Sequence, residues 1–139
     1  MLINGPDAVY VFSLGYISRT AYWVRQCSPE KFENYKMFFM LGSMGLTKAI
    51  ACGIAMHAMK EVVVVRGDGD YLFCNSDMID EPPWNLTEYV LSNEIYESTG
   101  GQKCVPIEGH YTIKPSPTDP RINKDPKEIA RDIIHCLAS

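Results

Sequence analysis

The chain has 139 residues, enough for one domain with a sizeable core, and its formal net charge of −4 accompanies a pI near 5.3. Apolar residues make up 46% and charged residues 22%, and no apolar run could span a bilayer, which predicts a soluble domain without membrane contact. The acidic balance without Lys/Arg clusters excludes a nucleic-acid surface, and no Walker motif or dinucleotide fingerprint occurs.

The first predicted element is a strand over residues 8–14, a mostly apolar run. Arg19 and Arg25 follow it and are candidates for contacting an anionic substrate, although a single arginine more often forms a surface salt bridge. Aromatic residues are dense in this third of the chain, and we expect most of them in the core or at an interface: Tyr16, Tyr22, Trp23, Tyr35, Phe38 and Phe39.

A helix of small residues is predicted over residues 47–59, after a glycine-containing loop at residues 39–46. The next element is predicted to be a strand, because residues 62–65 are four valines, a β-branched run typical of strands buried on both faces of a parallel sheet. This strand ends in Gly67-Asp68-Gly69. Glycine on each side of Asp68 allows a sharp turn and a close approach of the backbone to a ligand.

Asp68 is the first candidate site residue, because it follows a buried strand at the edge where open α/β sheets bind ligands. A helix is expected to begin within residues 70–78, and its free N–H groups would face an anion such as a diphosphate. A lone Gly-Asp-Gly after a strand is most often only a tight turn. The assignment therefore depends on a second feature.

Asn93 provides that second feature. Residues 85–91 predict the next strand, and the Glu81-Pro82-Pro83 cluster before it predicts the turn that ends the preceding helix. Asn93 would then lie beside Asp68 at the same edge of the sheet. Magnesium prefers oxygen ligands and usually takes only one or two from side chains. Asp68 and Asn93 together therefore predict a magnesium site that binds a diphosphate.

The remaining features carry less information about function. Residues 114–126 predict an extended surface stretch, and residues 126–137 predict a final helix. His110 is a candidate for assisting protonation, although a lone loop histidine is more often structural. A cytoplasmic location is expected, because residues 1–10 lack the features of a secretory signal. The unclustered spacing of the following residues predicts reduced thiols and no zinc site: Cys27, Cys52, Cys74, Cys104, Cys136, His57, His110 and His135.

The interval of twenty-five positions from Asp68 to Asn93, followed by Ser-Thr-Gly-Gly-Gln at residues 98–102, resembles the signature of the thiamine diphosphate-dependent enzymes. In that signature both the Gly-Asp-Gly and the asparagine supply magnesium ligands. The resemblance implies an α/β fold, a three-layer doubly wound and mainly parallel sheet with helices on both faces. Residues 1–139 would form a single diphosphate-binding domain of this type.

The segment Gly42-Ser43-Met44-Gly45 looks like the loop that contacts the pyrimidine ring in thiamine diphosphate-dependent decarboxylases. In those enzymes a large apolar residue bends the cofactor, and Met44 occupies the matching position. Gly42 would offer its carbonyl to the aminopyrimidine. Without this setting, a methionine near a helix start would be interpreted as a core residue.

Residues 40–45 and 98–102 together are similar to the sulfopyruvate and phosphonopyruvate decarboxylases, as are residues 15–19 and 120–122. The resemblance implies that Asp68, Asn93 and the Ile95 carbonyl bind magnesium. The full set of cofactor-binding residues that it implies is Gly42, Ser43, Met44, Gly67, Asp68, Gly69, Asp70, Asn93, Ile95 and Tyr96.

Such decarboxylases need two domains of this size, so the resemblance implies a beta subunit of a split 2-oxo acid decarboxylase. The partner would be a pyrimidine-binding alpha subunit in a heterotetramer or larger assembly, and it would supply the glutamate that activates the cofactor. No catalytic residue is assigned to this chain, and the identity of the 2-oxo acid stays open. Two alternatives also stay open: a thiamine diphosphate-dependent carboligase subunit, and a non-catalytic scaffold or regulatory subunit of the same fold.

Several positions depart from the family pattern. Asp70 stands where a small residue such as serine is common, and a carboxylate there is unfavourable beside a phosphate unless it turns away or caps a helix. Ser92 replaces the usual aspartate before the asparagine, and Glu94 and Glu97 stand where glycine is frequent. Residues 74–84 lack the usual helix pattern, which indicates a different substrate preference or partner contact.

Overall fold

The computed structural model describes residues 5–73, 81–109, 111–112, 131 and 134 of the chain. The extended stretch expected at residues 114–126 lies outside the described residues, as do His110 and most of the final helix expected at residues 126–137. The same holds for most of the divergent segment at residues 74–84.

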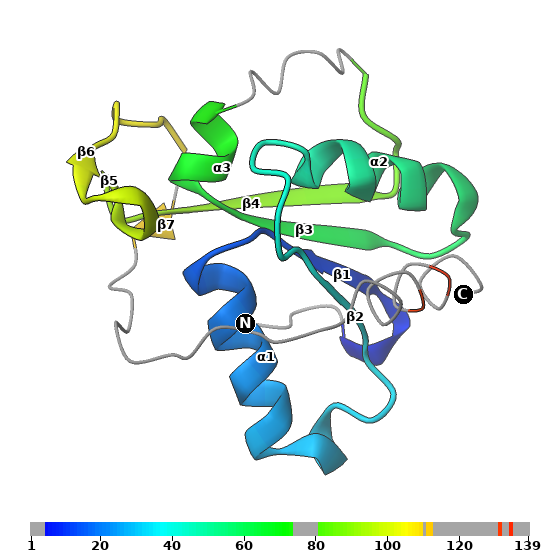
Figure 1. The fold of residues 1–139 in the computed structure, drawn as a ribbon. Helices are drawn as coiled ribbons and strands as arrows, with labels where there is room; N and C mark the ends of the chain where they lie inside the picture. The colour runs from blue at the N-terminus through cyan, green and yellow to red at the C-terminus, as the bar shows by residue number, and fades with distance from the viewer. Residues whose placement is uncertain (1–4, 74–80, 110, 113–130, 132–133, 135–139) are drawn as a thin grey trace.

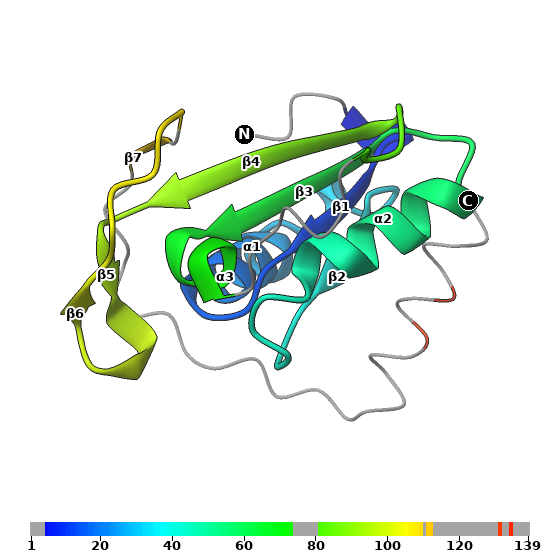
Figure 2. The same cartoon turned by 90° about the horizontal axis from the view of Figure 1, so that it is seen from above.

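A parallel sheet of five strands forms the centre of the fold, in the spatial order β2-β1-β3-β4-β7 (Figures 1 and 2). Val9 of β1 lies opposite Lys36 of β2 on one side and Val62 of β3 on the other. The five strands are β1 (Val9–Phe12), β2 (Lys36–Phe39), β3 (Val62–Gly67), β4 (Leu86–Ser92) and β7 (Tyr111–Thr112). The predicted α/β class with a mainly parallel sheet is confirmed.

Side chains alternate along the strands and build two apolar faces. Helix α2 (Thr47–His57) covers one face and α1 (Tyr16–Cys27) covers the other, so that the sheet lies between two helical layers (Figure 1). The α2 face contains Val9, Val11, Phe38, Val62 and Val64, and the α1 face contains Tyr10, Phe12, Phe39, Val63 and Val65. Burial of one such side chain stabilises the fold by about 1.5–3 kcal/mol. The predicted three-layer arrangement is therefore confirmed.

The valine run is buried as predicted, and its four side chains are at most 5% exposed. Helix α2 begins at Thr47 as expected but ends at His57, because Ala58 has an extended conformation (φ −85°, ψ 136°). Helix α3 (Asp68–Phe73) begins two residues before the expected segment, and the rest of that segment lies outside the described residues. None of the described helices is long and apolar enough to cross a membrane.

The sequence interpretation assigned no element to α1 or β2. Strand β2 has only four residues and is buried on both faces, so it gives no polar and apolar alternation to recognise. The expected burial of aromatic residues is confirmed for Phe38 and Phe39, whereas Trp23 remains 36% exposed. A short antiparallel ribbon joins β5 (Ile95–Tyr96) and β6 (Gln102–Lys103). Single 3-10 turns lie at Gly5–Asp7, Pro29–Lys31 and Glu97–Thr99.

The strand order reverses between β1 and β3. The chain passes from β1 to β2 on one side and then returns through α2 to β3 on the other side of β1. At such a switch point, the loops that leave the carboxyl ends of the two central strands diverge, and ligands bind between them. The fold therefore directs attention to the residues that follow β1 and β3.

Candidate functional site

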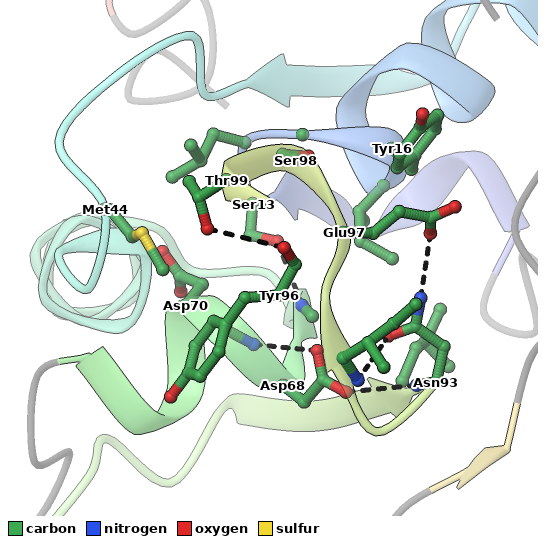
Figure 3. Close-up of a pocket in the computed structure, with 17 residues that line it drawn as sticks. Ser13, Tyr16, Met44, Asp68, Asp70, Asn93, Tyr96, Glu97, Ser98 and Thr99 are labelled. Carbon is green, nitrogen blue, oxygen red and sulfur yellow. Dashed lines mark hydrogen bonds between the residues drawn. The ribbon is translucent and has the colours of Figure 1, made fainter. Parts of the chain in front are cut away.

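A pocket lies at the carboxyl ends of β1, β3 and β4, at the switch point of the sheet (Figure 3). It contains about 610 Å³ of space, including the part open to solvent. The lining comes from residues 13–17 after β1, Met44 before α2, residues 67–70 after β3, and Leu91, Asn93 and residues 95–99 around the end of β4.

The Asp68 side chain is 5% exposed and is held at the floor of this pocket (Figure 3). Its Oδ2 atom accepts hydrogen bonds from the Ser92 hydroxyl at 2.8 Å and from the backbone N–H groups of Asn93 and Glu94 at 3.0 and 2.9 Å. Its Oδ1 atom accepts the Gly69 N–H at 2.8 Å. An oxygen with two lone pairs and one donor can still bind a cation, so Oδ1 is the atom of Asp68 suited to a ligand.

Asn93 lies beside Asp68, as the strand order predicted. Its Nδ2 atom donates to Glu97 Oε2 at 2.8 Å, and its Oδ1 atom accepts the Ile95 N–H at 3.3 Å (Figure 3). The Glu97 carboxylate accepts hydrogen bonds and cannot donate them when ionised. This bond therefore fixes the orientation of the Asn93 amide. Its Oδ1 atom accepts the Ile95 N–H and keeps a second lone pair for another partner.

The backbone at Glu94 has a left-handed conformation, with φ of 62°. Only glycine adopts this region without strain, which is a physical reason for the glycine that the family resemblance led us to expect at this position. The turn is nevertheless required here, because it directs the Glu94 N–H toward Asp68 Oδ2. The unexpected glutamate thus keeps the local geometry and bears a conformational cost.

Gly69 brings two side chains from distant segments together over the pocket. A Cβ atom placed on Gly69 would lie 3.1 Å from Tyr96 Cδ1 and 3.3 Å from Met44 Cε. Both distances are shorter than ordinary contacts, so no larger residue fits without movement of its neighbours. The missing side chain leaves Tyr96 and Met44 packed against the start of α3 (Figure 3).

Tyr96 also interacts with the buried thiol of Cys104. Burial raises the pKa of the Tyr96 hydroxyl, and the nearby Cys104 adds to this effect. Burial raises the pKa of the Cys104 thiol as well, and the Asp68 charge acts in the same direction. Both groups are therefore neutral near pH 7, which leaves the carboxylates as the charged groups of the pocket wall.

Asp70 is among the lining residues of the pocket, and its carboxylate is hydrogen-bonded to other segments of the protein. Oδ1 accepts the Gly45 N–H at 2.8 Å and the Thr47 hydroxyl at 2.9 Å, and Oδ2 accepts Arg66 Nε at 2.7 Å. The side chain thus turns away from the position where an anion was expected to bind. It secures the loop before α2, which agrees with the first of the two expected alternatives, a carboxylate that turns away, and not with a cap on the following helix.

The structure does not bring every predicted residue to the pocket. Met44, Gly67, Asp68 and Gly69 line it, together with Asp70, Asn93, Ile95 and Tyr96. Gly42 and Ser43 lie on the loop that carries Met44, but they are exposed and are not among the lining residues of the described part. They remain predicted contacts on the open side of the pocket.

The sequence analysis did not single out Gly15 and Ser98 as site residues. Gly15 follows β1 with φ of 83°, and a Cβ atom on it would lie 3.2 Å from Ser98 Oγ. The segment after β1 and the segment around Ser98 therefore approach each other closely at Gly15, which has no side chain. A glycine directly after the first predicted strand is the signal that could have identified this wall, because ligands bind beside the loops that follow the carboxyl ends of such strands.

The side-chain oxygen atoms suited to a cation lie at the ends of β3 and β4. Within the described ranges, no three His, Cys, Asp or Glu side chains form a metal-binding cluster. A metal here would instead use Asp68 Oδ1, Asn93 Oδ1 and backbone oxygen, a set that suits a hard cation such as Mg²⁺. The molecule is thus a doubly wound α/β protein with a ligand pocket at its topological switch point.

Comparison with protein families identifies the class more closely. Residues 16–136 match the family described as thiamine pyrophosphate enzyme, C-terminal TPP binding domain. This match includes most of the chain and every segment of the pocket except residues 13–15. The chain belongs to the thiamine pyrophosphate (thiamine diphosphate) enzyme family.

Curated relatives have sequence identities of about one third. The sulfopyruvate decarboxylase subunit beta of Methanothermobacter thermautotrophicus is 35% identical over 99 residues, 69% of this chain and 50% of the relative. The phosphonopyruvate decarboxylase of Streptomyces viridochromogenes is 34% identical over 102 residues, 71% of this chain and 24% of the relative. The sulfopyruvate decarboxylase of Methanosarcina acetivorans is 39% identical over 100 residues, with coverages of 70% and 24%. The matched region thus spans about half of the beta subunit and a quarter of the two longer enzymes.

Proposed function

We propose that this chain is the diphosphate-binding, beta-type part of a thiamine diphosphate-dependent decarboxylase that acts on a small 2-oxo acid. In this proposal residues 1–139 form one domain and act in the cytoplasm with a pyrimidine-binding alpha partner, as a heterotetramer or a larger assembly. One observation carries the proposal: three donors fix Asp68 Oδ2, two of them the backbone N–H groups of Asn93 and Glu94, while Oδ1 accepts the Gly69 N–H and keeps a lone pair for a cation.

The residues of the pocket fit magnesium and a diphosphate. Asp68 Oδ1, Asn93 Oδ1 and the Ile95 carbonyl would supply oxygen ligands to Mg²⁺, and diphosphate oxygens and water would complete a set of the kind that Mg²⁺ prefers. Gly15 and Gly69 support the fit, because a side chain at either position would intrude on Ser98 or on Tyr96 and Met44. Because glycine has no side chain, the backbone at these positions can come close to a bulky anionic group such as a diphosphate.

The Asp70 carboxylate does not oppose this assignment. It would repel a diphosphate if it faced the pocket unpaired, and this was the strongest argument for a non-catalytic scaffold. Instead Arg66 donates to its Oδ2 atom at 2.7 Å, and the Gly45 N–H donates to its Oδ1 atom. A paired and hydrogen-bonded carboxylate presents little net charge to a neighbour, so the geometry favours a cofactor-binding role.

Met44 and Tyr96 would form the apolar wall that orients the cofactor. Met44 is half-buried, and its terminal methyl group, Cε, lies over Gly69. A side chain at this position can hold a flexible ligand bent by contact alone. Gly42 and Ser43, exposed on the same loop, would contact the pyrimidine end, where the partner would complete the site.

When bound, thiamine diphosphate supplies the nucleophilic carbon and the electron sink for decarboxylation. The residues of this chain bind magnesium, orient the cofactor and exclude water from one wall of the site. The glutamate that activates the cofactor would come from the partner. The names of the curated relatives favour 2-oxo acids that carry a sulfonate or phosphonate group.

The test is calorimetric titration of thiamine diphosphate and Mg²⁺ into the chain alone and into its complex with the alpha-type partner. We expect magnesium-dependent binding in the complex, loss of binding in Asp68→Ala, and retention in Asp7→Ala, an exposed acid outside the pocket. If a verified complex does not bind the cofactor, the catalytic proposal fails and a scaffold remains. If binding occurs, sulfopyruvate, phosphonopyruvate and pyruvate are compared as substrates, with aldehyde release separating decarboxylation from carboligation.

A further inference from the structure

Arg66 is an arginine inside the apolar strand β3, and its side chain is 0% exposed. A buried charge is costly unless it is paired and hydrogen-bonded. Nε donates to Asp70 Oδ2 at 2.7 Å, Nη2 donates to the Asp70 carbonyl at 2.8 Å, and Nη1 donates to Glu88 Oε1 at 2.9 Å. The guanidinium also lies over the Tyr71 ring, 5.3 Å from its centroid. Two of these three hydrogen bonds therefore join Arg66 to Asp70, and the third joins it to Glu88.

The other face of the Asp70 carboxylate reaches a different segment of the chain. Its Oδ1 atom accepts the N–H of Gly45, a residue with φ of 88°, and the hydroxyl of Thr47, the first residue of α2. Both groups are buried. One carboxylate thus joins the start of α3 to the turn between β2 and α2.

Met44 directly precedes Gly45, so this hydrogen bond fixes the backbone next to the side chain that packs over Gly69. The Met44 side chain is unbranched and flexible. It can contact a ligand in one defined position only if its backbone is held in place. We infer that Asp70, with Arg66 as its buried counter-ion, is a positioning residue that holds Met44 in place to shape the cofactor. This inference rests on the proposed function.

Asp70→Ser tests the inference, because serine is small and cannot accept the same three hydrogen bonds. Since this change removes one of the two carboxylates that pair with the buried Arg66 and leaves Glu88, the double variant Arg66→Met/Asp70→Ser removes the arginine charge as well and protects against simple misfolding. Glu88→Gln is the matched control. It removes the other carboxylate bonded to Arg66, whereas the turn at Gly45 is bonded to Asp70 and, among the described residues, not to Glu88.

The first readout is hydrogen exchange of the Gly45 amide in the cofactor-free full chain. Exchange should be at least about tenfold faster in both Asp70 variants and close to wild type in Glu88→Gln, as expected for loss of one charge-assisted bond. Wild-type protection of Gly45 in the double variant would overturn the inference.

The second readout is the Kd of thiamine diphosphate with Mg²⁺ in the complex with the partner. Asp70→Ser should raise it about tenfold, and the same change in a Met44→Ala background should have almost no further effect, because coupled residues do not act additively. If the two substitutions raised the Kd by independent factors that multiply in the double variant, Asp70 would not act through Met44. If the wild-type complex binds no cofactor, the proposed function fails; faster Gly45 exchange confined to the Asp70 variants would then still support the role of Asp70 in holding the turn.

Discussion

Ser92, the last residue of β4, donates its hydroxyl to Asp68 Oδ2 over 2.8 Å and so links the ends of two neighbouring strands. The family resemblance led us to expect aspartate here, which cannot donate when ionised. Serine supplies a neutral donor without adding negative charge beside Asp68. The departure at Ser92 therefore helps to fix the carboxylate rather than to compete with it.

Ser92→Ala should lower the free energy of unfolding by about 1–2 kcal/mol, because it removes a donor from a buried carboxylate. Two backbone donors would remain on Asp68 Oδ2. Urea unfolding measures the change. Thr99→Ala serves as the control, since the Thr99 hydroxyl is exposed and its bond to the Tyr96 carbonyl is long, at 3.4 Å. Equal losses in the two variants would contradict the importance of the Ser92 bond.

Glu94→Gly should raise the free energy of unfolding by about 0.5–1 kcal/mol. A glutamate is strained in this left-handed conformation, with φ of 62°, whereas glycine adopts it without strain. The Glu94 side chain is exposed, so its removal loses little packing. Thermal unfolding measures the gain, and Glu94→Ala should show no gain, because alanine keeps the same strain. A stabilisation by alanine equal to that by glycine would assign the effect to the charge instead.

Gly69→Ala should reduce cofactor affinity while changing stability little. The added Cβ atom would press on Tyr96 and Met44 at 3.1 and 3.3 Å, and the better helix propensity of alanine would offset part of the strain. Calorimetric titration of the complex gives the affinity. Gly53→Ala in α2 is the matched control: no atom lies within 4 Å of its Cβ position, so we expect about 0.5–1 kcal/mol of stabilisation and unchanged binding.

Arg66→Met should destabilise the chain by about 3–5 kcal/mol, because it leaves Asp70 buried without its counter-ion. Lys48→Gln should cost less than about 1 kcal/mol, since its contact with Glu88, at 3.2 Å, joins partly exposed groups. Guanidinium unfolding compares the two. Similar losses in the two variants would mean that the buried ion pair contributes no more to stability than the partly exposed one.

Stability should fall as pH rises above about 9. The pKa of Cys104 is raised above its ordinary value of 9.0 by burial and then by Asp68, and burial also raises the pKa of Cys52. The folded state therefore keeps protons that the unfolded state releases, so this stability is complete below pH 9 and is lost as pH rises through the folded pKa. Unfolding from neutral pH to about 10 should show a smaller decline in Cys104→Ala and an unchanged decline in Cys27→Ala, at an exposed position.

The sequence could predict the part of the site that depends on strand order alone. A valine run followed by Gly-Asp-Gly, and a second strand followed by Asn93, imply neighbouring carboxyl ends once the sheet is parallel. The structure confirms that β3 and β4 are neighbours and that the Asn93 N–H lies 3.0 Å from Asp68 Oδ2. Helix α2 was also predictable, because its small residues pack against a flat sheet face.

The direction of the Asp70 side chain could not be predicted in this way. It depends on Gly45 and Thr47, which are more than twenty positions away, and on Arg66, which the sequence analysis passed over at the end of an apolar strand. The position of the Asp70 carboxylate near the expected diphosphate suggested electrostatic repulsion between them. Only the tertiary arrangement shows that the charge is already neutralised.

The parallel strand order has a consequence for the assembly of the pocket during folding. Each pair of neighbouring strands in the sheet is separated in sequence by at least one crossover, so no local hairpin can form first. Contacts of long sequence separation form slowly. A nascent chain that ended before β4 would contain Asp68 but none of the three donors that fix its Oδ2 atom. Competence to bind would therefore arise abruptly, when β4 docks, and cofactor binding in the cell would report on completion of the fold.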